Sequence, residues 1–257
     1  MFAKNDKKCL VLVPIYRPFT ELEKAFVLNN LEKTSGFLTV FFGPQTCETL
    51  IEEFPGFKNI KFQAFESHFF KNIRAYNLLM LSEIFYISFS EYEYLLIVQP
   101  DAFLFKNEVE QWCDKGFDYI GAPWFRYNKL QKGKLYWWIY KNTYQKYLSL
   151  NRKGGWLYNK VGNGGLSLRK TSSFIESLQK APKDLLQRYQ SADWDELNED
   201  VFWSIEVPKF NNTFSIPDFE TALKFSVEQD PENAVEIFLK GELPFGCHDP
   251  LRQNKEF

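Results

Sequence analysis

Asp101 interrupts a strongly hydrophobic stretch of the chain, LLIVQPDAFLF at residues 95–105. A carboxylate in such surroundings is costly unless a charged or polar group pairs with it. A divalent cation is one such partner, and a cation held there can neutralise a diphosphate. The alternative is that Asp101 caps a turn favoured by Pro100, and the residues alone leave both interpretations open.

One histidine and an adjacent pair of acids are further candidates for chemistry. His248 is one of only two histidines, and an imidazole between Gly246 and Pro250 can ligate a metal from a rigid loop. Glu199 and Asp200 begin a predicted helix, where one of the two can enter a pocket and act as a general base. The alternatives are a loop histidine without a role, and acids that the helix dipole favours in a first turn.

Three glycines surround Asn163 in the segment GNGG at residues 162–165. Glycine lets a backbone approach a ligand closely, so this segment is a candidate binding loop. Its spacing matches neither the GxGxxG fingerprint nor a phosphate-binding P-loop, so it predicts no nucleotide site by itself.

Strands that alternate with helices are predicted to position these residues. The expected strands are residues 9–16, 37–44, 60–66, 92–105, 117–124, 161–170 and 221–230, and the expected helices are 21–33, 47–54, 72–89, 171–182 and 198–210. Such alternation is typical of a mostly parallel sheet that is covered on both faces and binds ligands at the carboxyl ends of its strands. We expect one α/β domain over residues 1–257, with an irregular second half and a loop-like segment at 243–257.

Composition narrows the class of protein. The chain has 31 Lys and Arg against 33 Asp and Glu, so a net charge of −2 indicates no particular partner. The sequence contains no apolar run of the roughly 18 residues that span a bilayer, and its start is a poor signal peptide. The four cysteines are scattered without a CxxC pair, which argues against zinc and for a reducing compartment. We therefore expect a cytoplasmic protein.

The basic charge is concentrated in one part of the chain. Residues 119–175 carry eleven Lys and Arg, no Asp or Glu, and four of the seven Trp. This mixture suits an anionic surface, such as the inner face of a membrane or an acidic glycan. A solvated face with some core aromatics explains it equally well, and nucleic acid is not expected because no nucleic-acid-binding motif accompanies the charge.

The motifs together resemble the bacterial family DUF5672, which is similar to GT-A glycosyltransferases. The resemblance rests on YLLIVQPDAFLF, FDYIGAPW, VGNGGLSLR, NEDVFW, ALKFSVE and PFGCHDP, in that order, and covers most of the chain from Lys71 onward. It implies a GT-A-like, Rossmann-like sheet and a nucleotide-sugar donor. Residues 1–105 would form the nucleotide-sugar-binding half, and residues 106–257 the acceptor-binding and catalytic half.

The resemblance also implies roles for single residues. Asp101 would bind Mn²⁺ or Mg²⁺ together with His248. Asp200, or Glu199 beside it, would be the base of an inverting transfer. Donor binding would involve Pro14, Tyr16, Arg17, Gln99 and Asp101, and acceptor binding would involve Trp124, Asn163, Gly164 and Gly165.

Gln99 departs from the family pattern, because it occupies the first acidic position of the Asp-x-Asp motif. An amide carries no charge, so metal-independent transfer stays open. The resulting hypothesis is a cytoplasmic glycosyltransferase, peripheral at the membrane, that acts on lipopolysaccharide, capsule or another lipid-linked glycan. The alternative is a non-catalytic sugar- or lipid-binding module that has kept the fold.

The basic segment generates a first prediction. Reversing the charges of Lys129, Lys132 and Lys134 is expected to weaken binding to anionic vesicles, because attraction between the segment and the lipid headgroups is lost. Binding of the unmodified chain should fall as salt rises, since salt screens surface charge. Co-sedimentation measures both effects, and failure of the unmodified chain to bind at low salt would contradict the membrane interpretation.

Overall fold

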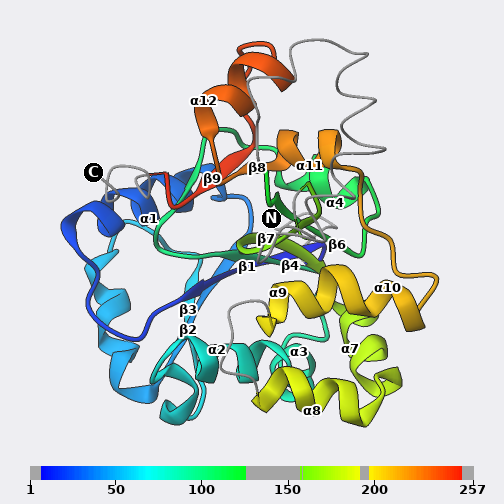
Figure 1. Cartoon of the computed structure of the whole chain (residues 1–257). Helices are drawn as coiled ribbons and strands as arrows, with labels where there is room; N and C mark the ends of the chain where they lie inside the picture. Colours follow the sequence, from blue (N-terminus) through cyan, green and yellow to red (C-terminus); the bar gives the residue numbers. More distant parts are fainter. Residues whose placement is uncertain (1–6, 126–156, 158, 192–196, 251–257) are drawn as a thin grey trace.

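A six-stranded sheet forms the centre of the computed structural model, which describes residues 7–125, 157, 159–191 and 197–250 (Figure 1). The strand order is β3-β2-β1-β4-β7-β6. The strands are β1 (Cys9–Pro14), β2 (Leu38–Gly43), β3 (Ile60–Ala64), β4 (Tyr94–Val98), β6 (Tyr119–Pro123) and β7 (Val161–Lys170). The first four pair in parallel, whereas β7 is antiparallel to both β4 and β6. The prediction of a mostly parallel α/β sheet is confirmed.

Helices cover both faces of this sheet (Figure 1). The face that contacts α1 and α4 is formed by one apolar cluster, and the face that contacts α2, α3, α7 and α8 by another. The helical segments are α1 (Glu21–Lys33), η1 (Gln45–Glu53), η2 (Ser67–Phe70), α2 (Ile73–Met80), α3 (Glu83–Ile87), α4 (Val109–Asp114), α7 (Thr171–Lys180), α8 (Lys183–Ser191), α9 (Glu199–Val201), η7 (Phe202–Glu206), α10 (Val207–Phe210), α11 (Phe219–Phe225), α12 (Pro231–Asn233) and η8 (Ala234–Phe238).

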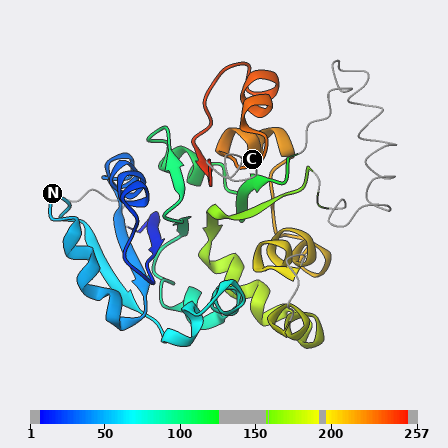
Figure 2. The ribbon, with the colours of Figure 1, turned by 60° about the vertical axis from the view of Figure 1, so that its left-hand side comes forward.

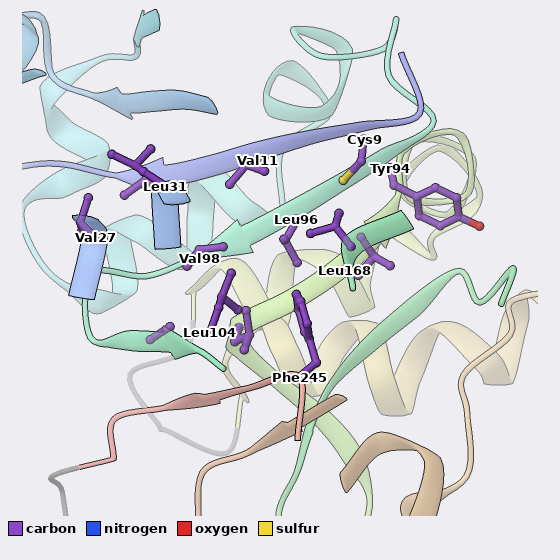
Figure 3. Packing of buried hydrophobic residues seen from close by; sticks show 14 of the residues in the cluster. Cys9, Val11, Val27, Leu31, Tyr94, Leu96, Val98, Leu104, Leu168 and Phe245 are labelled. Atoms are coloured by element: carbon purple, nitrogen blue, oxygen red, sulfur yellow. The ribbon is translucent and has the colours of Figure 1, made fainter. Parts of the chain in front are cut away.

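The central strands are apolar throughout because each contributes side chains to both clusters. In β4, Leu96 and Val98 face the α1 side, where they pack near Leu104 and Phe245 (Figure 3). Leu95 and Ile97 alternate to the opposite side. A strand with period-two side chains and no solvent-facing surface reads as a continuous hydrophobic run, which is the pattern seen in the sequence.

The segment expected to be one strand over 92–105 is instead two strands that belong to different sheets. A turn closes after β4, where the Ala102 amide donates to the Gln99 carbonyl at 2.9 Å with Pro100 and Asp101 between them. Pro is favoured at the first central position of such a turn. The chain then enters a three-stranded sheet, in the order β5 (Ala102–Leu104), β9 (Gly246–His248) and β8 (Ser226–Val227).

Three other expectations need correction. Half of the segment 221–230 lies in α11, and β8 is its only strand; the loop-like segment after 243 contains β9. The helix expected over 72–89 divides into α2 and α3 near Ser82. Its predicted start is confirmed, because the Asn72 side chain accepts from the Ala75 amide. In Figure 2 the amino-terminal elements, blue to cyan, lie on one side and the yellow to red elements on the other.

Most of the basic segment, residues 126–156, lies outside the described residues, so the expectation of a membrane-facing surface stays a prediction. Among the residues that the structure describes, no helix combines the length and the hydrophobicity needed to cross a bilayer. All four cysteines are buried free thiols.

Asn30 of α1 fixes the start of the small sheet. Its side-chain amide donates to the Ala102 carbonyl at 2.7 Å, and its oxygen accepts from the Leu104 amide at 2.9 Å. The side chain is buried, so both backbone groups depend on it rather than on water. Asn30 thereby holds the residue that follows Asp101.

We expect Asn30→Ala to lower the free energy of unfolding by about 1–3 kcal/mol, because two buried backbone groups of β5 lose their partner. Urea unfolding measures the loss. Asn212→Ala is the matched control, since Asn212 is exposed. An equal loss in the two variants would contradict the assigned role of Asn30.

Candidate active site

Gln99, Asp101 and His248 meet at the carboxyl end of β4. The Nε2 atom of His248 lies 3.1 Å from Oε1 of Gln99 and 3.3 Å from Oδ1 of Asp101. One strand pairing produces this contact, because β5 begins directly after Asp101 and its first residue, Ala102, pairs with His248 of β9. The pairing therefore brings His248 to Gln99 and Asp101, from which it is distant in the sequence.

The charges in this cluster stabilise one another. Burial lowers the pKa of His248, but the carboxylates of Asp101 and Glu228 outweigh it and raise that pKa to about 10. Burial raises the pKa of Asp101, whereas His248 lowers it, and the result is a pKa below the usual value. In the absence of a ligand the site thus holds an imidazolium between carboxylates at neutral pH.

The GNGG segment is in β7 and lies directly against these side chains. The Gly165 carbonyl accepts a hydrogen bond from the backbone N–H of Gln99 at 2.9 Å. A Cβ at Gly165 would lie 2.1 Å from Nε2 of His248, and one at Gly164 would lie 2.5 Å from Oε1 of Glu199. Both positions therefore require glycine, because polar side chains of the protein itself approach them closely. The sequence analysis had explained these glycines by the approach of a ligand.

Glu199 is held in a buried ion pair with Arg169. The two carboxylate oxygens accept from the two terminal nitrogens of the guanidinium at 2.8 and 3.1 Å. The same guanidinium donates to the Tyr86 hydroxyl at 2.9 Å and, through Nε, to Ser167 at 3.1 Å. The side chains of Arg169 and Glu199 are 1% and 5% exposed. This geometry favours a structural role for Glu199.

Asp200 has a different environment. One carboxylate oxygen accepts from the Val201 amide at 2.8 Å. Burial, followed by the charge of Glu199, raises the pKa of Asp200 to about 8. A Cβ at Gly164 would lie 3.6 Å from Cβ of Asp200, so the acid lies beside the GNGG segment. A carboxylate with a pKa near neutrality has the property expected of a general base.

The donor candidates of the first strand lie at the same edge of the sheet. Pro14 is the last residue of β1, which pairs in parallel with β4. Tyr16 is 47% exposed, and Arg17 forms two 2.8 Å hydrogen bonds with Glu23. Because Arg17 already has this partner, its availability to a donor depends on Glu23.

Trp124 is partly buried and packs against the core that α2, α3 and η7 share. Its ring lies against Gly162, where an added Cβ would be 2.8 Å from the indole.

A cavity of about 470 Å³ is lined by residues of α4, α11 and η8, such as Trp112, Lys224 and Phe238, and by none of the predicted site residues.

The cluster at the end of β4 fits a divalent cation. Neighbouring ligands of an octahedral Mg²⁺ lie about 3 Å apart. The distances from Nε2 of His248 to Oε1 of Gln99 and to Oδ1 of Asp101 are close to this value. Oδ1 of Asp101 is buried and has no hydrogen-bond partner among the described residues. No group of three or more His, Cys, Asp or Glu within those residues could hold an ion, so a substrate would have to complete the ligand set.

Sequence analysis missed two residues of the site, Arg169 and Glu228. Arg169 was counted only as part of the basic stretch, although a lone basic residue in the strand segment GLSLR signals a buried partner. Glu228 ends the motif ALKFSVE, but Lys224 and Ser226 interrupt its apolar residues, so no hydrophobic run marks this acid in the sequence.

Comparisons with known proteins assign the family and the fold. The sequence profile described as "Protein of unknown function (DUF5672)" matches residues 59–248, more than half of the chain, and the chain belongs to this family. No curated protein matches the sequence. The resemblance that the motifs indicated is confirmed.

Two solved structures show the fold. The apo structure of the bifunctional glycosyltransferase WbbM is 12% identical, with a TM-score of 0.54 over 96% of this chain and 46% of that chain. Apo mouse xyloside xylosyltransferase 1 is 10% identical, with a TM-score of 0.50 over 95% and 97%. The α/β sheet is therefore of the GT-A glycosyltransferase type.

The contrast between the two acids generates a prediction about stability. Glu199→Gln should lower the free energy of unfolding by about 3–5 kcal/mol, because Arg169 keeps a buried charge without a charged partner. Asp200→Asn should stabilise the protein increasingly as pH rises. The folded-state pKa is raised, so ionising Asp200 costs stability above its ordinary pKa, and the amide does not ionise.

Between pH 5 and pH 8 the advantage of Asp200→Asn over the unmodified protein should grow by at least about 1 kcal/mol. Chemical denaturation at each pH measures it. A constant difference between the two proteins across that range would show that Asp200 ionises normally.

Proposed function

We propose that the protein is a glycosyltransferase that moves a sugar from a nucleotide-sugar donor to a hydroxyl of a glycan or lipid-linked acceptor. The observation that carries the proposal is the meeting of Gln99, Asp101 and His248 at the carboxyl end of β4, beside the GNGG segment and Asp200. In open α/β sheets this edge is where ligands bind. The GT-A type of fold supports the same conclusion.

Asp101 and His248 would hold the divalent cation, and Gln99 would add a neutral oxygen. When bound, Mn²⁺ or Mg²⁺ neutralises charge on a departing diphosphate. With so few protein ligands, the donor phosphates would have to supply further ligands, as is usual for Mg²⁺. Tyr16 and Pro14, at the end of β1, would contact the nucleotide base.

Asp200 would act as the general base. It takes the proton of the acceptor hydroxyl, whose oxygen attacks the anomeric carbon while the bond from that carbon to the diphosphate breaks. The pKa of about 8 supports this role, because such a group both ionises near neutral pH and binds a proton well. A single displacement of this kind inverts the configuration. Asn163, Gly164 and Gly165 would line the acceptor side, together with Trp124.

The charge of one segment supports an anionic acceptor at a membrane. The acid-free segment 119–175 suits a lipopolysaccharide, capsule or related lipid-linked glycan with anionic groups, reached from the cytoplasmic face of the membrane. Gln99 favours one alternative, a sugar-binding module without catalysis, because the site has one acid fewer than the family pattern. The raised pKa of Asp200 supports the enzyme.

The proposal predicts different defects for two isosteric variants. Asp101→Asn should weaken Mn²⁺-dependent binding of a nucleoside diphosphate, because the charge that holds the cation is lost. Asp200→Asn should leave this binding nearly unchanged and lower turnover by roughly 10²-fold or more. Titration calorimetry with UDP and GDP, and transfer rates from a panel of nucleotide sugars, measure the two effects.

Glu199→Gln is the comparison for Asp200→Asn. Its sugar-transfer rate is to be measured only on protein that is still folded. Near-normal transfer by Asp200→Asn would exclude the assigned base. Nucleotide binding without any release of nucleoside diphosphate, across the donor panel, would favour the binding module instead.

A further inference from the structure

Both nitrogens of the His248 imidazole lie close to polar side chains. Nε2 faces Gln99 and Asp101, whereas Nδ1 lies 3.3 Å from Oε1 of Glu228. The side chain of His248 is 12% exposed and that of Glu228 is 2% exposed. A carboxylate buried to this degree is costly unless it is paired, so the contact with the ring is energetically significant.

Glu228 is fixed in turn by Asn163. The second oxygen of Glu228 accepts from the Asn163 amide nitrogen at 2.5 Å, and the Asn163 oxygen accepts from the Gly165 amide at 3.0 Å. The second bond settles the orientation of the Asn163 side chain, because a backbone N–H can only donate. The Asn163 nitrogen must therefore point at Glu228.

The pairing of the small sheet places Glu228 beside His248. Val227 of β8 pairs in parallel with Cys247 of β9, so the next residues along the two strands are neighbours. The family motif ALKFSVE ends at Glu228, and neither the catalytic nor the donor roles proposed above use it. A buried acid in contact with a candidate ligand is typical of a group that orients that ligand.

We propose that Glu228 is a positioning residue, which Asn163 holds so that it keeps the proton of His248 on Nδ1 and directs Nε2 toward Gln99 and Asp101. The inference rests on the proposed cation site, and it concerns a residue outside the ligand set. A histidine that binds a metal through one nitrogen commonly donates the other N–H to a carboxylate, which fixes the tautomer and the ring orientation.

Glu228→Gln provides a sharp test because Asn163 dictates how the new amide lies. The Asn163 nitrogen requires an acceptor, so the oxygen of the new amide faces Asn163 and its NH₂ group faces His248. Nδ1 must then accept, so it cannot carry a proton, and the one proton left on the ring is on Nε2, the atom that a cation would bind. The variant keeps the size of the side chain and removes the proton from Nδ1 of His248.

Two measurements follow the change. Nitrogen-15 spectra should show Nδ1 of His248 protonated in the unmodified protein and unprotonated in Glu228→Gln, with His68, the other histidine, as an internal reference. Mn²⁺ affinity with UDP present, from paramagnetic resonance of the free ion, should fall by about 10–100-fold, the usual effect of losing such a partner. Glu232→Gln, at an exposed position of α12, is the matched control and should change neither.

A second variant covers the case in which Glu228→Gln does not fold. Asn163→Ala removes the group that holds Glu228 and leaves the carboxylate in place, so it should weaken Mn²⁺ binding to a smaller extent. Where Glu228→Gln folds, adding Asn163→Ala to it should cause no further loss, because the new amide is then no longer held with its NH₂ group toward His248.

The outcomes separate this inference from the function on which it rests. Unchanged Mn²⁺ affinity and a still protonated Nδ1 in Glu228→Gln would overturn the positioning role, even if the unmodified protein binds Mn²⁺ and transfers sugar. If the unmodified protein binds no Mn²⁺ and Glu228→Gln still removes the proton from Nδ1, the cation site fails while the positioning of His248 by Glu228 stands.

Discussion

The arrangement of the site depends on one buried ion pair, between Arg169 and Glu199. The guanidinium lies near the rings of Tyr119 and Phe174, and donates to Ser167, Tyr86 and both oxygens of Glu199. A buried charge pair is tolerated when its remaining hydrogen-bonding capacity is satisfied in this way. It joins β7 to α9, and so sets where the residue after Glu199 must lie.

The same pair makes two neighbouring acids different. Glu199 is paired with Arg169. Asp200 has no such partner on its carboxylate among the described residues, and burial together with the nearby charge of Glu199 raises its pKa. Environments that push the properties of two carboxylates apart are a common way to obtain one ionised and one protonatable acid in a single site. Gly164 is required for this arrangement, since a side chain there would collide with Glu199.

The sequence predicts the large sheet well because its strands are buried on both faces and therefore stand out as apolar runs. It also predicts that Asp101, His248 and the GNGG segment matter, since each places polar or flexible residues next to such a run. Periodicity cannot reveal the small sheet, because β5, β8 and β9 have two or three residues each and pair across long separations. The partners of Arg169 and Glu228 are hidden for the same reason: both are contacts between distant segments.

The three-stranded sheet also has a consequence for the order in which the protein can form during synthesis. Gln99 and His248 touch although they are 149 positions apart in the chain. The strands from β1 to β4 can pair soon after they leave the ribosome, since domains fold as their segments emerge. Until β9 emerges, β5 lacks that neighbour and presents backbone groups that another nascent chain can pair with. The edge that later supports the site is thus a point of vulnerability until β9 is made, and β9 both closes this edge and delivers the histidine.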